Sequence, residues 1–307
     1  MKATVPYYPY AAYQKEKYGE KVYKIPISLP VTCPNRDGSM GINGCDFCAE
    51  EGAGFETLSS KKPVKEQMEE NISYIGKRYG ANKFSAYFQN YTNTYMPMKD
   101  FKQYMEAVLD DRIVELAIST RPDCVSDEQL DYLKEYKRIH RKNIVMELGL
   151  QTANYHTLSR INRGHGLAAF IDATNRIKQR DLEICAHVIV NLPGDEDLDM
   201  IETSDILSAL KVEQVKLHAL YIMKNTIMGN QFEQGELSII SKAAYQRRVI
   251  LFLMHLSPEI AVQRLIGRAP KENSLFVNWN TSWWKIRDEI IAIMRQENAY
   301  QGKRAKF

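Results

Sequence analysis

The chain has 307 residues, of which 44% are hydrophobic and 26% are charged, and its formal net charge at pH 7 is +3. This is the composition of a folded protein with one large domain or two small ones, and it excludes a low-complexity chain. The apolar runs are too short to span a bilayer and the amino terminus lacks the apolar core of a signal peptide, so we expect a cytoplasmic protein without a membrane partner. The small positive charge permits a nucleic-acid partner without arguing strongly for one.

The first 21 residues combine tyrosine with lysine. The tyrosines are Tyr7, Tyr8, Tyr10, Tyr13 and Tyr18, and the lysines are Lys2, Lys15, Lys17 and Lys21. One interpretation is a platform on which RNA bases stack beside phosphate-binding lysines. The other is a segment that wraps around the domain and buries its rings, which suits tyrosine because one end of the side chain is polar. We favour the second interpretation.

Residues 21–29 are typical of a β-strand, and a cysteine-rich loop follows them. Cys33, Cys45 and Cys48 fall within sixteen residues, and the C-x-x-C spacing of the last two places both sulfurs on one side of a tight turn. The residues between them favour turns, so the loop is able to curl around an ion or a cluster. Five cysteines, an odd number, suit a reducing compartment and metal chemistry better than disulfides.

Two kinds of metal site fit three clustered thiols. A structural zinc site needs a fourth ligand, and the nearest histidine is His140, so Cys124 or Cys185 would have to supply it from a distance. A 4Fe–4S cluster usually has four cysteine ligands. A loop with three leaves one iron open to a small molecule, as in radical chemistry with S-adenosylmethionine (SAM). We favour the cluster, although the spacing differs from the commonest radical-SAM pattern, C-x-x-x-C-x-x-C.

The rest of the chain alternates between strand-like and helix-like segments. We predict strands at residues 83–88, 114–119, 143–150, 183–190, 214–220 and 259–265. We predict helices at residues 63–79, 99–109, 127–137, 155–160, 167–179, 196–210, 238–255 and 284–297, with Ser126 as the N-cap of the third. About six β/α units imply a parallel sheet, either a TIM-like barrel or a doubly wound sheet.

Polar residues gather where the predicted strands end. They are the cysteine loop, QNYTNT at 89–94, TRPD at 120–123, QT at 151–152 and NLPGD at 191–195. In both kinds of parallel sheet the ligand lies at the carboxyl ends of the strands, so we expect these segments to share one site.

Short motifs in a fixed order suggest a family. They are CPNRDG, GCDFC, AYFQNYTNT, ISTRPDC, ELGLQT, INRGH, VIVNLPGD and KLHALYIMKNT. Over residues 7–300 the chain resembles the radical-SAM proteins of the MnmL/YtqA and YhcC types, which are similar to the catalytic subunit of elongator. The resemblance implies an α/β fold, a partial TIM-type (β/α)6 barrel over residues 21–235, with an N-terminal extension (1–20) and a C-terminal extension of helices and a strand (236–307).

The resemblance also implies the chemistry. Cys33, Cys45 and Cys48 would bind a 4Fe–4S cluster, and SAM would chelate its open iron. An electron from a donor such as flavodoxin or ferredoxin would cleave SAM to methionine and a 5′-deoxyadenosyl radical. Proteins of the MnmL/YtqA type act on the wobble uridine of tRNA and convert its 5-carboxymethylaminomethyl group to 5-aminomethyl. The implied partner is therefore tRNA.

Further residues are assigned to SAM by the resemblance. Gln151 and Arg163 match a SAM-binding Gln and Arg, and Arg163 would meet the SAM carboxylate. Asn90, Thr92 and Asn93 stand where many relatives have a Gly-Gly-Glu turn for the methionine amino group. The ribose and adenine positions are Ser119, Glu147, which would partly replace a ribose-binding Glu, and Leu192. The alternative for Gln151 and Glu147 is an ordinary polar strand end.

Other polar residues leave open alternatives. Cys124 is a candidate catalytic residue, but a buried small residue is the commoner fate of a free cysteine. Lys216 and Lys224 flank the sixth strand and are candidates for binding phosphate or a substrate carboxylate. The same chemistry on another substrate, or a non-catalytic RNA-binding module shaped by metal, are the alternative functions.

Overall fold

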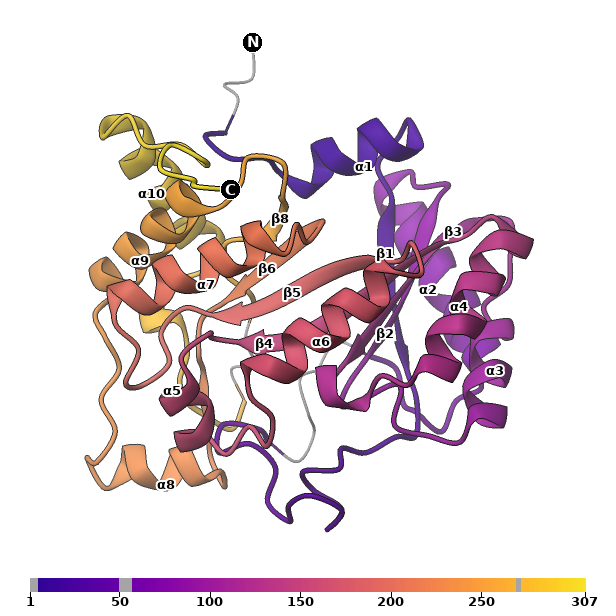
Figure 1. Cartoon of the computed structure of the whole chain (residues 1–307), viewed down its shortest axis with the longest axis horizontal. Helices are drawn as coiled ribbons and strands as arrows, with labels where there is room; N and C mark the ends of the chain where they lie inside the picture. Colours follow the sequence, from indigo (N-terminus) through magenta and orange to yellow (C-terminus); the bar gives the residue numbers. More distant parts are fainter. Residues whose placement is uncertain (1–4, 50–56, 269–271) are drawn as a thin grey trace.

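The computed structural model describes residues 5–49, 57–268 and 272–307. Seven parallel strands form one curved sheet, in the order β1-β2-β3-β4-β5-β6-β8 (Figure 1). The strands are β1 (Tyr23–Ser28), β2 (Phe84–Gln89), β3 (Ile113–Thr120), β4 (Asn143–Gln151), β5 (Glu183–Ile189), β6 (Gln214–His218) and β8 (Ala261–Arg264). Spatial order follows chain order without the reversal of a doubly wound sheet. The partial barrel is therefore confirmed, and the strand predicted at residues 259–265 joins its sheet as β8.

Helices cover the convex face of the sheet. They are α2 (Val64–Tyr79), α3 (Met98–Glu106), α4 (Asp127–His140), α5 (Tyr155–Arg160), α6 (Leu167–Lys178), α7 (Asp197–Ala209) and α9 (Lys242–His255). Their ends follow local chemistry. Ser126 caps α4 as predicted, because its hydroxyl accepts a hydrogen bond from the backbone N–H of Gln129 and the Gln129 side chain accepts one from the backbone N–H of Ser126. Helix α9 begins later than expected, since Ser241 is its N-cap.

The two faces of the strands pack against different surroundings. In β3, Leu116 and Ile118 pack into the main core between sheet and helices. On the concave face, Ala117, Val145 and Cys185 form a separate small apolar cluster against Tyr87. These inner side chains are mostly short, so the barrel interior is not filled at this level. Room for a cavity inside the barrel follows from that choice of residues.

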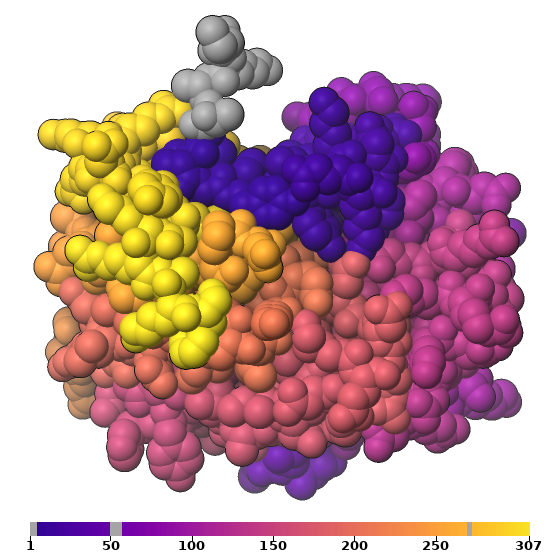
Figure 2. Space-filling model, turned by 45° about the horizontal axis from the view of Figure 1, so that its top comes forward, coloured from indigo at the N-terminus to yellow at the C-terminus, as the bar shows by residue number. Residues whose placement is uncertain are grey.

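The N-terminal segment closes the amino end of the barrel. Helix α1 (Tyr10–Tyr18) lies across this end, opposite the cysteine loop, and Figure 2 shows the indigo N-terminal segment lying on the surface between the yellow C-terminal segment and the magenta part of the chain. The hydroxyls of Tyr18 and Tyr13 donate to Glu115 at 2.8 Å and to Glu183 at 2.6 Å. Val262 donates a backbone hydrogen bond to Tyr8 at 2.9 Å, so the segment also covers the free edge of β8. The wrapping interpretation is confirmed.

The last third of the chain adds elements around the sheet. They are β7 (Ile222–Met223), which pairs antiparallel with β9 (Ser274–Phe276), α8 (Ile227–Glu233), α10 (Trp283–Gln296) and the short 3₁₀ helix η2 (Asn278–Asn280). A further 3₁₀ helix, η1 (Pro122–Cys124), follows β3. The ring of Trp279 packs on the core and donates a hydrogen bond to the Ile240 carbonyl at 2.8 Å. In the described part of the chain, no helix is both long and apolar enough to cross a membrane.

Candidate active site

The cysteine loop folds through local turns at the carboxyl end of β1. The backbone N–H of Arg36 donates to the Cys33 carbonyl, and that of Cys48 donates to the Cys45 carbonyl, each at 2.8 Å. Gly44 takes a φ of +75°, which glycine adopts at little cost. Cys33 and Cys45 are buried and Cys48 is half-buried. All three line one cavity of about 560 Å³ inside the barrel mouth.

Each loop thiol has its own guanidinium neighbour. A nitrogen of Arg121 lies 3.9 Å from the Cys33 sulfur. A nitrogen of Arg163 lies 3.4 Å from the Cys45 sulfur, and one of Arg36 lies 3.5 Å from the Cys48 sulfur. These cations favour the thiolate form that iron needs. Three thiolates on an iron–sulfur cluster carry net negative charge, so the positive surroundings fit such a cluster.

Without iron, the loop thiols are not all reactive. Burial, with a further contribution from Cys45, raises the pKa of Cys48 to about 11, and Arg36 only partly opposes this rise. The distant cysteines lie elsewhere. Cys185 sits in the inner apolar cluster, and Cys124 opens to a different hollow. Neither lines the cavity with the three loop thiols, so the geometry offers no support for a closed zinc site.

The loop after β2 carries free acceptors. Asn90 and Thr92 line the cavity. The side-chain oxygens of both are buried and have no hydrogen-bond partner among the described residues. The amide of Asn93 instead holds the loop together, because it donates to the carbonyls of Ser119 at 2.9 Å and Asn90 at 3.0 Å. Buried acceptors without a partner are costly unless a ligand satisfies them, which fits the ammonium group of SAM.

Gln151 and Arg163 meet at the end of β4, and both line the cavity. Gln151 takes a φ of +76°, where the register between β4 and β5 shifts. Arg163 is buried, donates to the Gly149 carbonyl at 3.0 Å and keeps its Nε without a partner among the described residues. A Cβ at Gly149 would lie 2.6 Å from this guanidinium, so a larger residue there would force the Arg163 side chain to shift. The sequence assignment of an anion-binding Arg163 suits this geometry.

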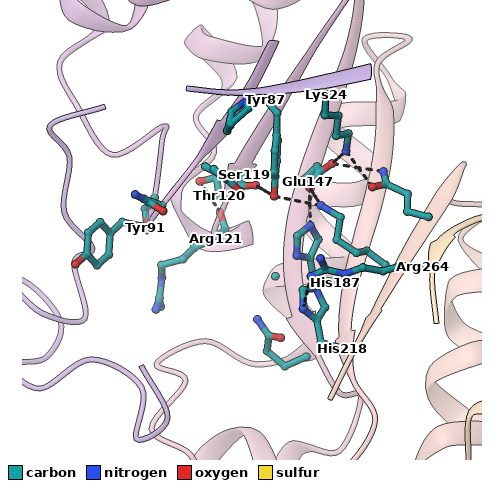
Figure 3. A pocket seen from close by; sticks show the side chains of 18 of the residues that line it. Lys24, Tyr87, Tyr91, Ser119, Thr120, Arg121, Glu147, His187, His218 and Arg264 are labelled. Carbon is teal, nitrogen blue, oxygen red and sulfur yellow. Dashed lines mark hydrogen bonds and ion pairs between the residues drawn. The ribbon is translucent and has the colours of Figure 1, made fainter. Parts of the chain in front are cut away.

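Glu147 is the centre of a charged group on the inner wall, and its side chain has 0% exposure. Its carboxylate pairs with Lys24, with Lys216 at 2.6 Å and with His187 at 2.7 Å (Figure 3). Burial alone would raise the pKa of Glu147, but the two ammonium groups and His187 outweigh it and hold that pKa well below its usual range. Both carboxylate oxygens are thus engaged. The ribose role of Glu147 stays a prediction, and Ser119, which donates to Tyr87 at 3.1 Å, also lines the cavity.

Two predicted site residues lie outside this cavity. Leu192 is buried in a small apolar cluster and lines a neighbouring hollow of about 420 Å³ together with Gly194. Cys124 lines a separate surface hollow, where burial raises the pKa of its thiol to about 12. The adenine role of Leu192 and the catalytic role of Cys124 therefore stay predictions.

Several cavity residues were not anticipated. They are Lys24, Arg36, Tyr87, His187, Gln263 and Arg264. The sequence contained a signal for two of them. Lys24 and His187 are polar residues within largely apolar strands. Because successive side chains of a strand point to opposite faces of the sheet, these two lie on the inner face, opposite the neighbouring core residues. A charged residue at such a position is expensive to bury unless it has a partner or a function.

The comparisons with known proteins decide the family. Residues 31–207, more than half of the chain, match the radical SAM superfamily, and residues 212–296 match the radical SAM C-terminal domain. The chain belongs to the radical SAM superfamily. It is therefore an enzyme of the kind that uses a 4Fe–4S cluster and SAM, as the sequence predicted.

Similar proteins cover nearly the whole chain. YhcC of Escherichia coli is 36% identical over 93% of this chain and 91% of its own length. YtqA of Bacillus subtilis is 32% identical over 94% and 89%. Elp3 of Methanocaldococcus infernus, an archaeal structure, superposes with a TM-score of 0.69 at 15% identity, over 91% of this chain and 64% of that one. At that identity the likeness concerns the fold alone. The resemblance to the YtqA and YhcC types is confirmed.

A shorter match reaches a tRNA enzyme. The tRNA uridine(34) acetyltransferase of Methanocaldococcus jannaschii is 26% identical over 44% of this chain and 24% of its own length.

Proposed function

We propose that the protein is a tRNA-modifying radical SAM enzyme that converts the 5-carboxymethylaminomethyl group of the wobble uridine to 5-aminomethyl. The observation that carries the proposal is the single cavity that joins the three loop thiols to a cation-rich inner wall. Such a cavity suits an anionic substrate group beside a cluster. The YtqA-type sequence and the partial match to a tRNA uridine(34) enzyme support RNA as the substrate.

The chain's own residues divide the work. Cys33, Cys45 and Cys48 would hold the cluster. The free acceptors on Asn90 and Thr92 would receive the SAM ammonium group, and the carboxylate of SAM would meet Arg163, with Gln151 and Ser119 beside it. When bound, cluster and SAM supply a 5′-deoxyadenosyl radical that removes a hydrogen atom from the substrate. The inner wall would orient the wobble side chain toward that point. An electron donor such as flavodoxin or ferredoxin completes the proposal.

The overall reaction balances if the two lost carbons leave as glyoxylate. One SAM and one water are consumed, and methionine, 5′-deoxyadenosine, glyoxylate, a proton and the aminomethyl nucleoside are formed. The carbon beside the nitrogen loses two electrons, and SAM gains two as it becomes methionine and 5′-deoxyadenosine. No further oxidant is needed.

The test begins with anaerobic reconstitution with iron and sulfide, followed by SAM and a strong reductant. Wild type should form 5′-deoxyadenosine and Cys45→Ala should not, whereas Cys185→Ala, a cysteine outside the cavity, should behave as wild type. Adding tRNA that carries the carboxymethylaminomethyl group should give the aminomethyl nucleoside and glyoxylate in equal amounts by mass spectrometry. No 5′-deoxyadenosine from a fully loaded protein contradicts the enzyme proposal. 5′-Deoxyadenosine without a change in the nucleoside favours another substrate.

A further inference from the structure

Arg264 in the cavity has no carboxylate partner among the described residues. Arg264, at the carboxyl end of β8, is half-buried and lines the cavity. One of its terminal nitrogens lies 2.8 Å from Nδ1 of His218, and its buried Nε has no hydrogen-bond partner among the described residues. A guanidinium presents several N–H donors in one plane, and two of them match the two oxygens of a carboxylate. The neutral ring of His218 satisfies only part of that capacity.

The other side chains that line this part of the cavity do not neutralise the charge of Arg264. Glu147 is the sole carboxylate among the described residues that line the cavity. It already binds Lys24 and Lys216, so one negative charge serves two ammonium groups. Figure 3 shows His187, His218 and Arg264 along one wall beneath Glu147. Burial first, and then the charge of Arg264, hold the pKa of His218 well below its usual range, so that ring adds no charge at pH 7. The wall carries excess positive charge.

This wall and the cysteine loop belong to one space. Tyr221 lines the same cavity, and the charges of both Cys48 and Arg264 act on its hydroxyl. Burial and Cys48 raise the pKa of Tyr221 to about 12, and Arg264 opposes that rise. A substrate group held at Arg264 is therefore within the same enclosed volume as a cluster bound to the loop.

We propose that Arg264, with His218 beside it, binds the carboxylate of the carboxymethylaminomethyl group and so selects the substrate's modification state. This inference rests on the proposed function. Removal of the two-carbon acid leaves an ammonium group, which the excess positive charge of the wall repels. The subsite thus binds the substrate side chain and disfavours the product side chain, which promotes release after one turnover.

The test compares three synthetic anticodon stem-loops that carry carboxymethylaminomethyluridine, aminomethyluridine or uridine at the wobble position. Binding to wild type, Arg264→Gln and Arg264→Lys is measured by fluorescence anisotropy with the cluster and SAM present. Wild type should bind the carboxylate-bearing stem-loop at least about tenfold more tightly than the aminomethyl one, the range for a hydrogen-bonded charge pair. Arg264→Gln should lose this preference, and Arg264→Lys should keep part of it because the charge remains.

Three results overturn the inference. The first is an unchanged preference in Arg264→Gln. The second is an equal loss of binding of Arg264→Gln to all three stem-loops, which assigns Arg264 to an RNA phosphate. The third is a fall in the SAM affinity of Arg264→Gln, measured by equilibrium dialysis without RNA, with an unchanged preference, which assigns Arg264 to the cofactor. Failure of the proposed function is a different result, in which wild type converts no carboxymethylaminomethyluridine. If wild type converts it and Arg264→Gln keeps the binding preference for the carboxylate-bearing stem-loop, the proposed function holds and only the inference about Arg264 is wrong.

Discussion

Glu147→Gln should destabilise the protein strongly even without cluster or substrate. The change keeps the shape of the side chain and removes its charge. The ammonium groups of Lys24 and Lys216 then repel each other inside the barrel without a carboxylate between them, where their side chains are 18% and 6% exposed. Each lysine then loses its carboxylate partner, and water reaches them poorly. The hydrogen bonds to Gln263 and Tyr87 and the contacts of both ammonium groups with the Tyr87 ring remain, and these carry no full negative charge.

The expected loss follows from the cost of an unpaired buried charge. Breaking a buried ion pair by removing one partner typically costs about 3–5 kcal/mol of unfolding free energy. That is a large share of the roughly 5–15 kcal/mol that stabilises a typical protein. The depressed pKa of Glu147 fixes the sign with pH. Its contribution is present above the unfolded-state pKa and disappears only as pH falls through the folded-state pKa, so the full loss should appear at pH 7.

The assay is urea denaturation of cluster-free protein at pH 7, followed by circular dichroism. Glu70→Gln is the matched control, because Glu70 pairs with Lys62 on the surface, where the side chains are 53% and 32% exposed. It should change the unfolding free energy by less than about 1 kcal/mol. Adding Lys216→Met to Glu147→Gln should recover part of the loss, since it removes one unpaired charge. A Glu147→Gln loss as small as that of the control, or no recovery, refutes the reasoning.

Three further predictions concern other parts of the molecule. A Cβ at Gly229 would lie 2.3 Å from a backbone oxygen of β7, so Gly229→Ala should lower the unfolding free energy in urea by ~1–3 kcal/mol. Gly76 is a helical glycine whose added Cβ would make ordinary contacts, so Gly76→Ala should raise the unfolding free energy by ~0.5–1 kcal/mol. Equal effects of the two substitutions contradict this reasoning. Arg36→Leu removes the guanidinium that lies 3.5 Å from the Cys48 sulfur. Because that cation stabilises the more negative reduced state, the substitution should lower the reduction potential of the reconstituted cluster. An unchanged midpoint potential in an EPR-monitored titration contradicts this prediction. Burial lowers the pKa of His187 to about 4, so the unfolded state takes up a proton that the folded state does not. The unfolding free energy should therefore fall by up to ~3 kcal/mol as pH drops from about 6.5 to about 4. A fall of the same size over this pH range in His187→Gln contradicts the assignment to His187.

Local patterns were sufficient for most of the fold. Residues 155–160 were predicted as a helix, and α5 spans the same residues. The predicted N-cap Ser126 begins α4. Helix α1 was missed because its single buried side chain, Gln14, leaves no apolar stripe for a periodicity to reveal. Strand β7 has two residues, too short for any alternation to show.

The sequence by itself determined the cofactor side of the site. Three cysteines on one turn-rich loop need no distant partner to define a ligand set, and strand ends in a parallel sheet must share one edge. These are local or topological facts. They were enough to name the loop thiols and to place the polar segment after β2 at the same site, whereas the SAM roles of Asn90 and Thr92 came from the family resemblance.

Only the tertiary structure decided the substrate side. Curvature of the sheet brings Lys24 in β1 within 2.9 Å of Gln263 in β8, although 239 residues separate them in the chain. Whether a buried charge is paired depends on such distant neighbours, because Coulomb energy follows separation in space and the local dielectric. Lys24 and Arg264 look alike in the sequence as cations in strands. The fold gives Lys24 a carboxylate, whereas Arg264 has no carboxylate partner among the described residues.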